Sequence, residues 1–430
     1  MRRIVVVGAG VIGLLCAYEL RRRGAAVTLI DKGQPGAGCS WANNGWVVPS
    51  FSAPLPAPGL VRTSLAWMLR PASPLYIRPR PDPDLVRWLW AFRRRCNPRD
   101  YEAGLRAVAD ANRRTLDLFD GLRSDGVEFE IHRSRALFLF LTRPAREAVL
   151  EDLERLTAGG YPGPQRIDAA EVREMLPQVR PEVLGGILAP EERHVRPETL
   201  VAGLVGRLRA MGVEIREGIE ALGLLRRGDS VTALRTSREE IEGDQFLLAA
   251  GAWSAALGRR LGLCLPIQAG KGYSITIADP GMEFPGPVYL DEARVAISPF
   301  TGALRIGGTM ELSGVNTTLD PRRLDAIRAG ARRYLHRWPA GSAEEEWVGM
   351  RPLTPDGLPV IGRIPAYDNL YVATGHGMYG VTLAPATAAA LAALTSGDPP
   401  PFDIAPFRPE RFHQSKPTGS AATRRRTIDG

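Results

Sequence analysis

The pattern of apolar and polar residues is most regular at the start of the chain. An apolar run over 4–7 is followed by the loop Gly8-Ala9-Gly10-Val11-Ile12-Gly13, and the apolar spacing predicts a helix over 11–22. A second apolar run over 27–30 ends at Asp31. Strand, glycine turn, helix, strand and acid in this order form the unit that binds the ADP part of a dinucleotide.

Each residue type in this unit has a physical reason. Gly8 permits the tight turn, Gly10 lets the backbone approach a pyrophosphate, and Gly13 lets the helix pack closely on the strand. The helix N-terminus presents free N–H groups and the positive end of a dipole to the phosphates. Asp31 is placed to accept hydrogen bonds from ribose hydroxyls.

Periodic apolar residues predict further elements. Helices are predicted over 84–95, 103–122, 145–156 and 382–395. Strands are predicted over 213–215, 245–250 and 369–373. Three strand-like runs between 273 and 309, separated by Gly and Pro, indicate an antiparallel sheet inserted between α/β segments. The Pro-rich stretch over 49–83 predicts an irregular excursion, with at most a short helix between Pro58 and Pro71.

These elements predict an α/β fold with two domains, a discontinuous Rossmann-like domain that binds a dinucleotide and an antiparallel-sheet α+β substrate domain. The first domain is expected to comprise 1–60, 145–265 and 340–405, and the second 61–144 and 266–339. The polar end of the chain, 413–430, is expected to be a disordered tail.

Composition narrows the classes of function. With 44% hydrophobic and 24% charged residues, the chain is typical of a soluble globular protein, and no apolar run reaches the length of about 20 residues that spans a bilayer. The start resembles a signal peptide, but the glycine unit accounts for it better, so a cytoplasmic location is expected. The net charge of +8 is spread out, so no nucleic-acid partner is expected. The four scattered cysteines lack metal-site spacing, so no metal is expected.

Three later segments carry the features of a ligand site. Residues 246–254 lead a strand into a small-residue turn, where the backbone can approach a ligand. Residues 351–362 form a Pro- and Gly-rich loop that holds Arg351 and an Asp. Residues 374–382 form a second glycine loop leading into a helix, whose N-terminus can face a group that gains negative charge.

The chain resembles the FAD-dependent amine and amino-acid oxidoreductases of the D-amino-acid oxidase/glycine oxidase class, and it looks most like the bacterial D-amino-acid dehydrogenases. The resemblance extends to about Phe407, and its most specific segments are 39–45, 84–97, 251–254, 271–274, 351–362 and 375–377. It implies non-covalent FAD and oxidation of a D-amino acid, or of a cyclic or secondary amine acid such as D-proline or 4-hydroxyproline. An imino acid forms by hydride transfer to flavin N5, and the electrons pass to a quinone or respiratory carrier.

The resemblance also implies roles for individual residues. Those expected to hold FAD are Gly8, Gly10, Val11, Ile12, Gly13, Asp31, Lys32, Ser40, Ala42, Asn43, Asn44, Gly45, Ala221, Gly251, Trp253, Gly375, Gly377, Met378, Gly380, Val381 and Thr382. Arg351 would clamp the substrate carboxylate, because its guanidinium fork matches a carboxylate bidentately. Tyr273 is the candidate second contact. Relatives such as glycine oxidase carry a Tyr where Ala296 falls here, so Tyr379 is the alternative. His376 is a candidate acid/base or a packing element.

Several alternatives stay open at this point. Within the class, the reduced enzyme could pass electrons to oxygen and produce hydrogen peroxide. In another class, the protein could be a flavin-binding sensor or assembly partner without turnover. The segment around Trp88, Trp90 and Arg87 to Arg95 could contact membrane lipid, since Trp and Arg suit the interface, or it could pack on its own domain.

Overall fold

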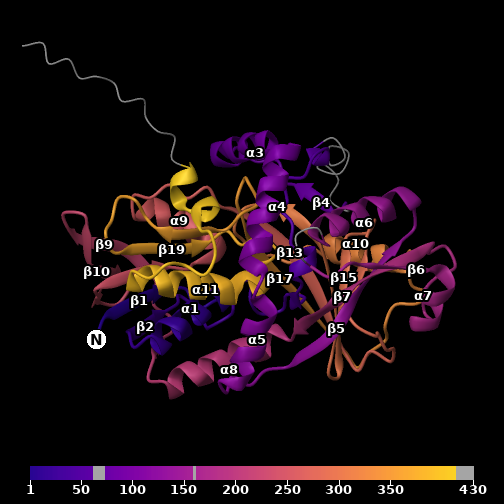
Figure 1. Cartoon of the computed structure of the whole chain (residues 1–430), viewed down its shortest axis with the longest axis horizontal. Coiled ribbons are helices and arrows are strands. Elements are labelled where there is room, and N and C mark those ends of the chain that lie inside the picture. The colour runs from indigo at the N-terminus through magenta and orange to yellow at the C-terminus, as the bar shows by residue number, and fades with distance from the viewer. Residues whose placement is uncertain (62–72, 158–160, 413–430) are drawn as a thin grey trace, which may run out of the picture.

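Two sheets lie side by side along the long axis of the molecule (Figure 1). The computed structural model describes residues 1–61, 73–157 and 161–412. The expected disordered tail, and most of the expected short helix between Pro58 and Pro71, therefore lie outside the described residues. No helix in the described ranges is both long enough and apolar enough to cross a bilayer.

The first sheet has six strands in the order β18-β19-β12-β1-β2-β8. All neighbours pair in parallel except β18 with β19. The strands are β1 (Arg3–Val7), β2 (Ala26–Ile30), β8 (Glu214–Arg216), β12 (Gln245–Leu248), β18 (Val360–Arg363) and β19 (Leu370–Thr374).

Both faces of this sheet are covered, which explains the continuous apolar runs in its strands. In β1, Ile4 and Val6 join the core formed with α1 (Val11–Arg22), α8 (Pro197–Ala210) and α11 (Gly380–Ser396). Val5 and Val7 face the opposite core, built with α9 (Ser254–Arg260) and a small antiparallel sheet. The strands of that small sheet are β9 (Ala221–Arg227), β10 (Ser230–Thr236) and β11 (Glu240–Glu242).

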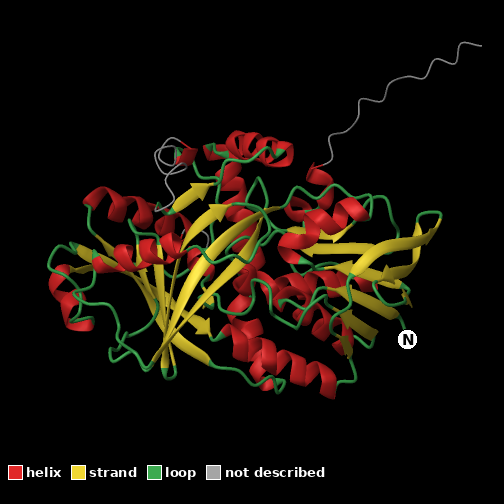
Figure 2. Ribbon diagram, turned by 180° about the vertical axis from the view of Figure 1, so that it is seen from behind, coloured by secondary structure: helices red, strands yellow, loops and turns green. Residues whose placement is uncertain are grey.

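The second sheet has ten strands and is mostly antiparallel (Figure 2). Its main path is β17 (Ala343–Leu353), β13 (Gln268–Ala278), β16 (Ala303–Leu312), β15 (Val295–Phe300), β14 (Val288–Leu290), β5 (Ile131–Phe140), β7 (Gly185–Val195) and β3 (Trp46–Val47). Off this path, β4 (Leu75–Ile77) pairs with β16 and β6 (Gln165–Asp168) with β7. One face packs in a core with α10 (Pro321–Arg332) and α7 (Ala169–Met175).

The remaining helices lie around the junction of the two sheets and against the ten-stranded sheet (Figure 1). They are α3 (Pro83–Arg95), α4 (Pro98–Asn112), α5 (Thr115–Ser124) and α6 (Arg143–Thr157). Short 3-10 turns complete the chain: η1 (Pro49–Phe51), η2 (Gly251–Trp253), η3 (Ala405–Phe407) and η4 (Pro409–Phe412). The single helix expected over 103–122 is in fact two helices. Thr115 donates to the Asn112 side chain at the break, and both residue types favour such local bonds over helix interiors.

The predicted fold class is confirmed, but sheet pairing differs from the expected domain ranges. Strands β3, β6, β7 and β17 fall in ranges assigned to the dinucleotide-binding domain, yet they pair within the ten-stranded sheet. Neither of the two long strands, β7 and β17, has a clear signal. β7 contains Pro190 and charged residues, and β17 has three glutamates directly after Ala343. Such residues are depleted in strands, so long-range pairing overrides local propensity here.

Candidate functional site

One cavity of about 1350 Å³ runs between the two sheets, from Asp31 and Ala221 to Arg351 and Tyr379. All four residues predicted to be catalytic line it. So do all the residues predicted to hold FAD, except Gly13 and Gly375. The fold thus brings segments from distant parts of the chain to one site.

The glycine turn at the start of the chain forms a cradle that only glycines can make. A Cβ on Gly8 would lie 2.5 Å from the Ala249 carbonyl oxygen, and one on Gly13 would lie 1.8 Å from the Gly8 oxygen. Gly8 also has a φ of +109°, which favours glycine. Gly10, at the N-cap of α1, has no side chain to cover the helix end. The cradle therefore leaves room for a pyrophosphate at the N-terminus of α1.

Asp31 is fixed at one end of the cavity, where the adenosine of a dinucleotide is expected. Its two carboxylate oxygens accept from Ala9 N–H (2.7 Å) and Gly33 N–H (2.8 Å). Each oxygen keeps a further lone pair for a ribose hydroxyl. The Nζ of Lys32 lies 4.4 Å from the centre of the Trp253 ring. These two residues, both predicted to hold FAD, therefore line the cavity side by side.

The loop over 39–45 is fastened to the ten-stranded sheet. Asn44 Nδ2 donates to the Ala296 carbonyl (3.0 Å), and Ser274 Oγ donates to the Ala42 carbonyl (2.8 Å). Arg305, which is fully buried and pairs with Glu198 at 2.8 Å, donates to the Asn43 carbonyl (2.8 Å). The sequence did not reveal Arg305, because its partners are far away along the chain.

The wall opposite this loop is built by the two other glycine segments. Thr374 Oγ1 donates to the Gly251 carbonyl at 2.9 Å. Gly375 and Gly377 have φ values of +78° and +56°, so the turn between β19 and α11 needs glycine. The turn brings the N-terminus of α11 to the cavity, which is lined there by Gly380, Val381 and Thr382. A helix N-terminus at this place favours negative charge in a bound group.

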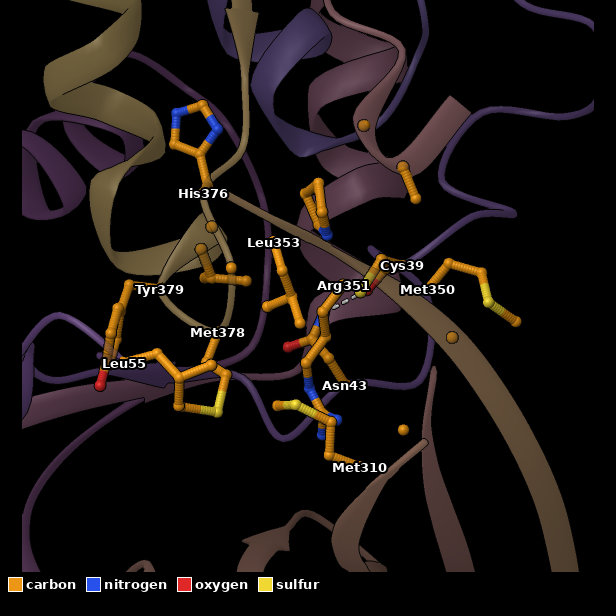
Figure 3. A pocket seen from close by; sticks show the side chains of 18 of the residues that line it. Cys39, Asn43, Leu55, Met310, Met350, Arg351, Leu353, His376, Met378 and Tyr379 are labelled. Atoms are coloured by element: carbon orange, nitrogen blue, oxygen red, sulfur yellow. Dashed lines mark hydrogen bonds between the residues drawn. The ribbon is translucent and has the colours of Figure 1, made fainter. Parts of the chain in front are cut away.

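Arg351 lies on β17 at the far end of the cavity (Figure 3). Its Nη1 donates to the Thr309 carbonyl oxygen at 3.0 Å. Burial lowers the pKa of the guanidinium, which still stays charged at physiological pH. Within residues 1–61, 73–157 and 161–412, no carboxylate lies within 4 Å of it. The side chain is therefore a half-buried cation that faces the cavity and is available to an anionic ligand.

Apolar side chains surround Arg351. Figure 3 shows Leu55, Met310, Leu353 and Met378 around it, and α3 contributes more of the same wall. We call the following set the apolar wall: Leu55, Trp88, Leu89, Phe92, Met310, Leu312, Leu353 and Met378. A charged group placed against this wall would lose its hydration without gaining a partner from it.

The other predicted catalytic residues are held differently. Tyr273 is buried in the core with α10, and its hydroxyl donates to Glu311 at 2.7 Å. The His376 ring lies against α11, with Nε2 3.0 Å from Thr387 Oγ1, and burial lowers its pKa to about 3 (Figure 3). Both arrangements favour packing roles. Tyr379, at the N-cap of α11, lines the cavity, and burial raises its pKa to about 12.

Tyr289 is a site residue that the sequence did not reveal. It lies on β14 directly opposite Ala296 on β15, and it lines the cavity. Its hydroxyl lies beside Arg294. The same hydroxyl opposes the effect of burial on the pKa of Arg351. A tyrosine therefore lies on the strand next to Ala296. β14 is only three residues long, so this pairing left little signal in the sequence.

A sheet with a nucleotide cradle, joined through one cavity to a larger sheet that presents a cation to it, is the arrangement of a flavin-dependent oxidoreductase. The chain belongs to the FAD dependent oxidoreductase family (DAO), whose model matches residues 3–394. The predicted family and the predicted FAD cofactor are thereby confirmed.

Named relatives agree with this assignment. The chain is 34% identical to a D-amino acid dehydrogenase of Cereibacter sphaeroides over 418 residues, which cover 95% of each chain. It is 32% identical to a D-amino acid dehydrogenase of Agrobacterium fabrum, over 93% of this chain and 97% of that one. The fold is similar to glycine oxidase from Geobacillus kaustophilus, with a TM-score of 0.75 and 23% identity over 95% of this chain and 98% of that one.

Proposed function

We propose that the chain oxidises a D-amino acid, or a cyclic or secondary amine acid such as D-proline or 4-hydroxyproline, to the imino acid. The observation that carries this proposal is Arg351, a half-buried cation with no carboxylate partner in the described residues, in the same cavity as the FAD cradle. A substrate carboxylate would complete a bidentate pair with its fork. The names of the relatives support the D-amino acid.

The tasks of the protein in this reaction are binding, orientation and exclusion of water. Bound FAD supplies the acceptor for the hydride that leaves Cα. Arg351 fixes the carboxylate, and the apolar wall excludes water from the reacting end of the cavity. When the substrate amine is neutral, the hydride can leave Cα without a general base. His376, the candidate acid/base, is buried against α11. We therefore assign no general base.

The apolar wall also supports a preference among amino acids. An uncharged substrate side chain can pack against Met310, Leu353 and the residues of α3, whereas a charged one would be desolvated without a partner. We therefore propose substrates with neutral side chains.

The proposed electron acceptor is a quinone or another respiratory carrier, reached by a cytoplasmic protein at the inner face of the membrane. The outer face of α3 supports this contact, because Trp90 and Val86 are 59% and 64% exposed. Arg94 lies 4.6 Å from the Trp90 ring, and such Trp–Arg pairs suit a lipid interface.

The test is flavin reduction by matched D- and L-amino acids, followed by stopped-flow reoxidation with a quinone analogue and with oxygen. We expect reduction by neutral D-amino acids, weak reduction by D-aspartate and D-lysine, and rapid reoxidation by the quinone analogue. Absence of reduction by any amino acid would favour the sensor or assembly-partner alternative. Rapid reoxidation by air with stoichiometric hydrogen peroxide would favour the oxidase alternative.

A further inference from the structure

The guanidinium of Arg351 lies directly over a bare stretch of backbone on the neighbouring strand. A Cβ on Gly272 of β13 would lie 2.2 Å from Arg351 Nη1, 2.4 Å from Cζ and 2.5 Å from Nη2. A residue with a Cβ could therefore not occupy this position without displacing the Arg351 guanidinium. Gly272 has an ordinary φ, so its own backbone conformation does not require glycine.

The next strand holds the same guanidinium through its Nη1, the nitrogen that lies nearest to Gly272. Strand β16 has one extra residue opposite β13, because Lys271 pairs with Glu311 and Tyr273 pairs with Gly308. Within this bulge, Thr309 has a φ of +58°, which is rare for a β-branched residue. Its carbonyl oxygen accepts from Arg351 Nη1 at 3.0 Å. Strained backbone of this kind persists where the surrounding structure holds it, and it gathers at functional sites.

We propose that Gly272 and the bulge at Thr309 are positioning elements that set the direction of the Arg351 fork. Gly272 lets the guanidinium lie flat across β13, and the Thr309 carbonyl holds one nitrogen. The remaining N–H groups are then left for a carboxylate. This proposal rests on the proposed function, in which Arg351 binds the substrate carboxylate.

The test is Gly272→Ala in the FAD-loaded protein. The methyl group must move the guanidinium, which is the far end of a flexible side chain, so the fold should tolerate the change. We expect kcat/KM to fall about 10- to 100-fold, because small misplacements of a positioning group are costly. A carboxylic acid that lacks the amino group of the substrate should also bind more weakly to the variant. Its affinity is measured by titration followed in the flavin spectrum. FAD content and the unfolding midpoint should stay near those of the wild type.

A matched control exists in the small three-stranded sheet. Gly223 of β9 lies opposite Arg235 of β10, and a Cβ on Gly223 would lie 3.0 Å from the Arg235 guanidinium. Neither residue lines the cavity. Gly223→Ala should therefore leave kcat/KM and the analogue affinity unchanged.

A double-mutant cycle separates this inference from the proposed function. In an Arg351→Ala background, Gly272→Ala should have no further effect on kcat/KM or analogue affinity, because nothing remains to be displaced. The inference is overturned if Gly272→Ala keeps wild-type values, or if it has the same effect with and without Arg351. If Arg351→Ala itself leaves kcat/KM unchanged, the carboxylate role of Arg351 fails instead.

Discussion

At the scale of single residues, we expect the proposed function to depend most on Arg351. In Arg351→Ala, a bound substrate carboxylate would be buried without its partner, which costs about 3–5 kcal/mol, so kcat/KM should fall roughly 10²–10³-fold or more. Arg351→Lys should recover only part of this, because an ammonium lacks the two-pronged fork. Steady-state kinetics with flavin occupancy measured in parallel tests it. If the Ala variant keeps wild-type kcat/KM, Tyr289 or Tyr379 must bind the carboxylate.

A second residue, Glu192, should make stability depend on pH. It is buried on β7, accepts from Ser50 N–H at 2.7 Å, and burial raises its pKa to about 7. The unfolded state therefore loses this proton at lower pH than the folded state, so Glu192 destabilises the fold as pH rises from about 4.5 to 7. Glu192→Gln does not titrate. Its free energy of unfolding, relative to wild type, should rise by roughly 3 kcal/mol between pH 4.5 and 7.5. A constant difference in urea unfolding would contradict this.

At the scale of elements, the sequence predicted what is encoded locally. The helix over 11–22 and its flanking strands were predicted almost to the residue, because glycine turn, periodicity and Asp31 all lie within one short segment. β17 was not predicted as part of the large sheet, although Arg351 was singled out from its end. Tyr289 was missed for the same reason. Its role depends on register with Ala296, and register is decided by pairing between strands.

Helix α3 offers a prediction at the same scale, because it forms much of the apolar wall. Its N-cap is Asp82, whose side chain accepts from Leu85 N–H at 3.0 Å. Asp82→Ala should lower the free energy of unfolding by about 1 kcal/mol and lower kcat/KM for large neutral substrates as the wall loosens. Urea unfolding and kinetics test both. Asp168→Ala, which uncaps α7 away from the cavity, should lose stability but keep kcat/KM. Equal kinetic effects of the two variants would contradict the role of α3.

At the scale of the whole molecule, the cavity joins both sheets, so a bound cofactor should act as part of the core. Its lining comes from the glycine turn of the first sheet and from β13 to β17 of the second. Ligand that binds only the folded state adds about 2.7 kcal/mol of stability at 100 times its Kd. The sequence predicted the cofactor from one local unit, but not this shared core, which exists only once the two sheets have met.

The last prediction is that FAD is bound without a covalent bond and stabilises both sheets together. Cys39 is a thiol that lines the cavity, but burial raises its pKa, so it stays protonated and is a poor nucleophile. Acid precipitation should therefore leave the yellow flavin in the supernatant. The apoprotein should unfold at a lower temperature than the holoprotein, and FAD, but not NAD, should restore the midpoint. Flavin colour retained in the precipitate would show a covalent bond, and an unchanged midpoint would show that the cofactor is not part of the core.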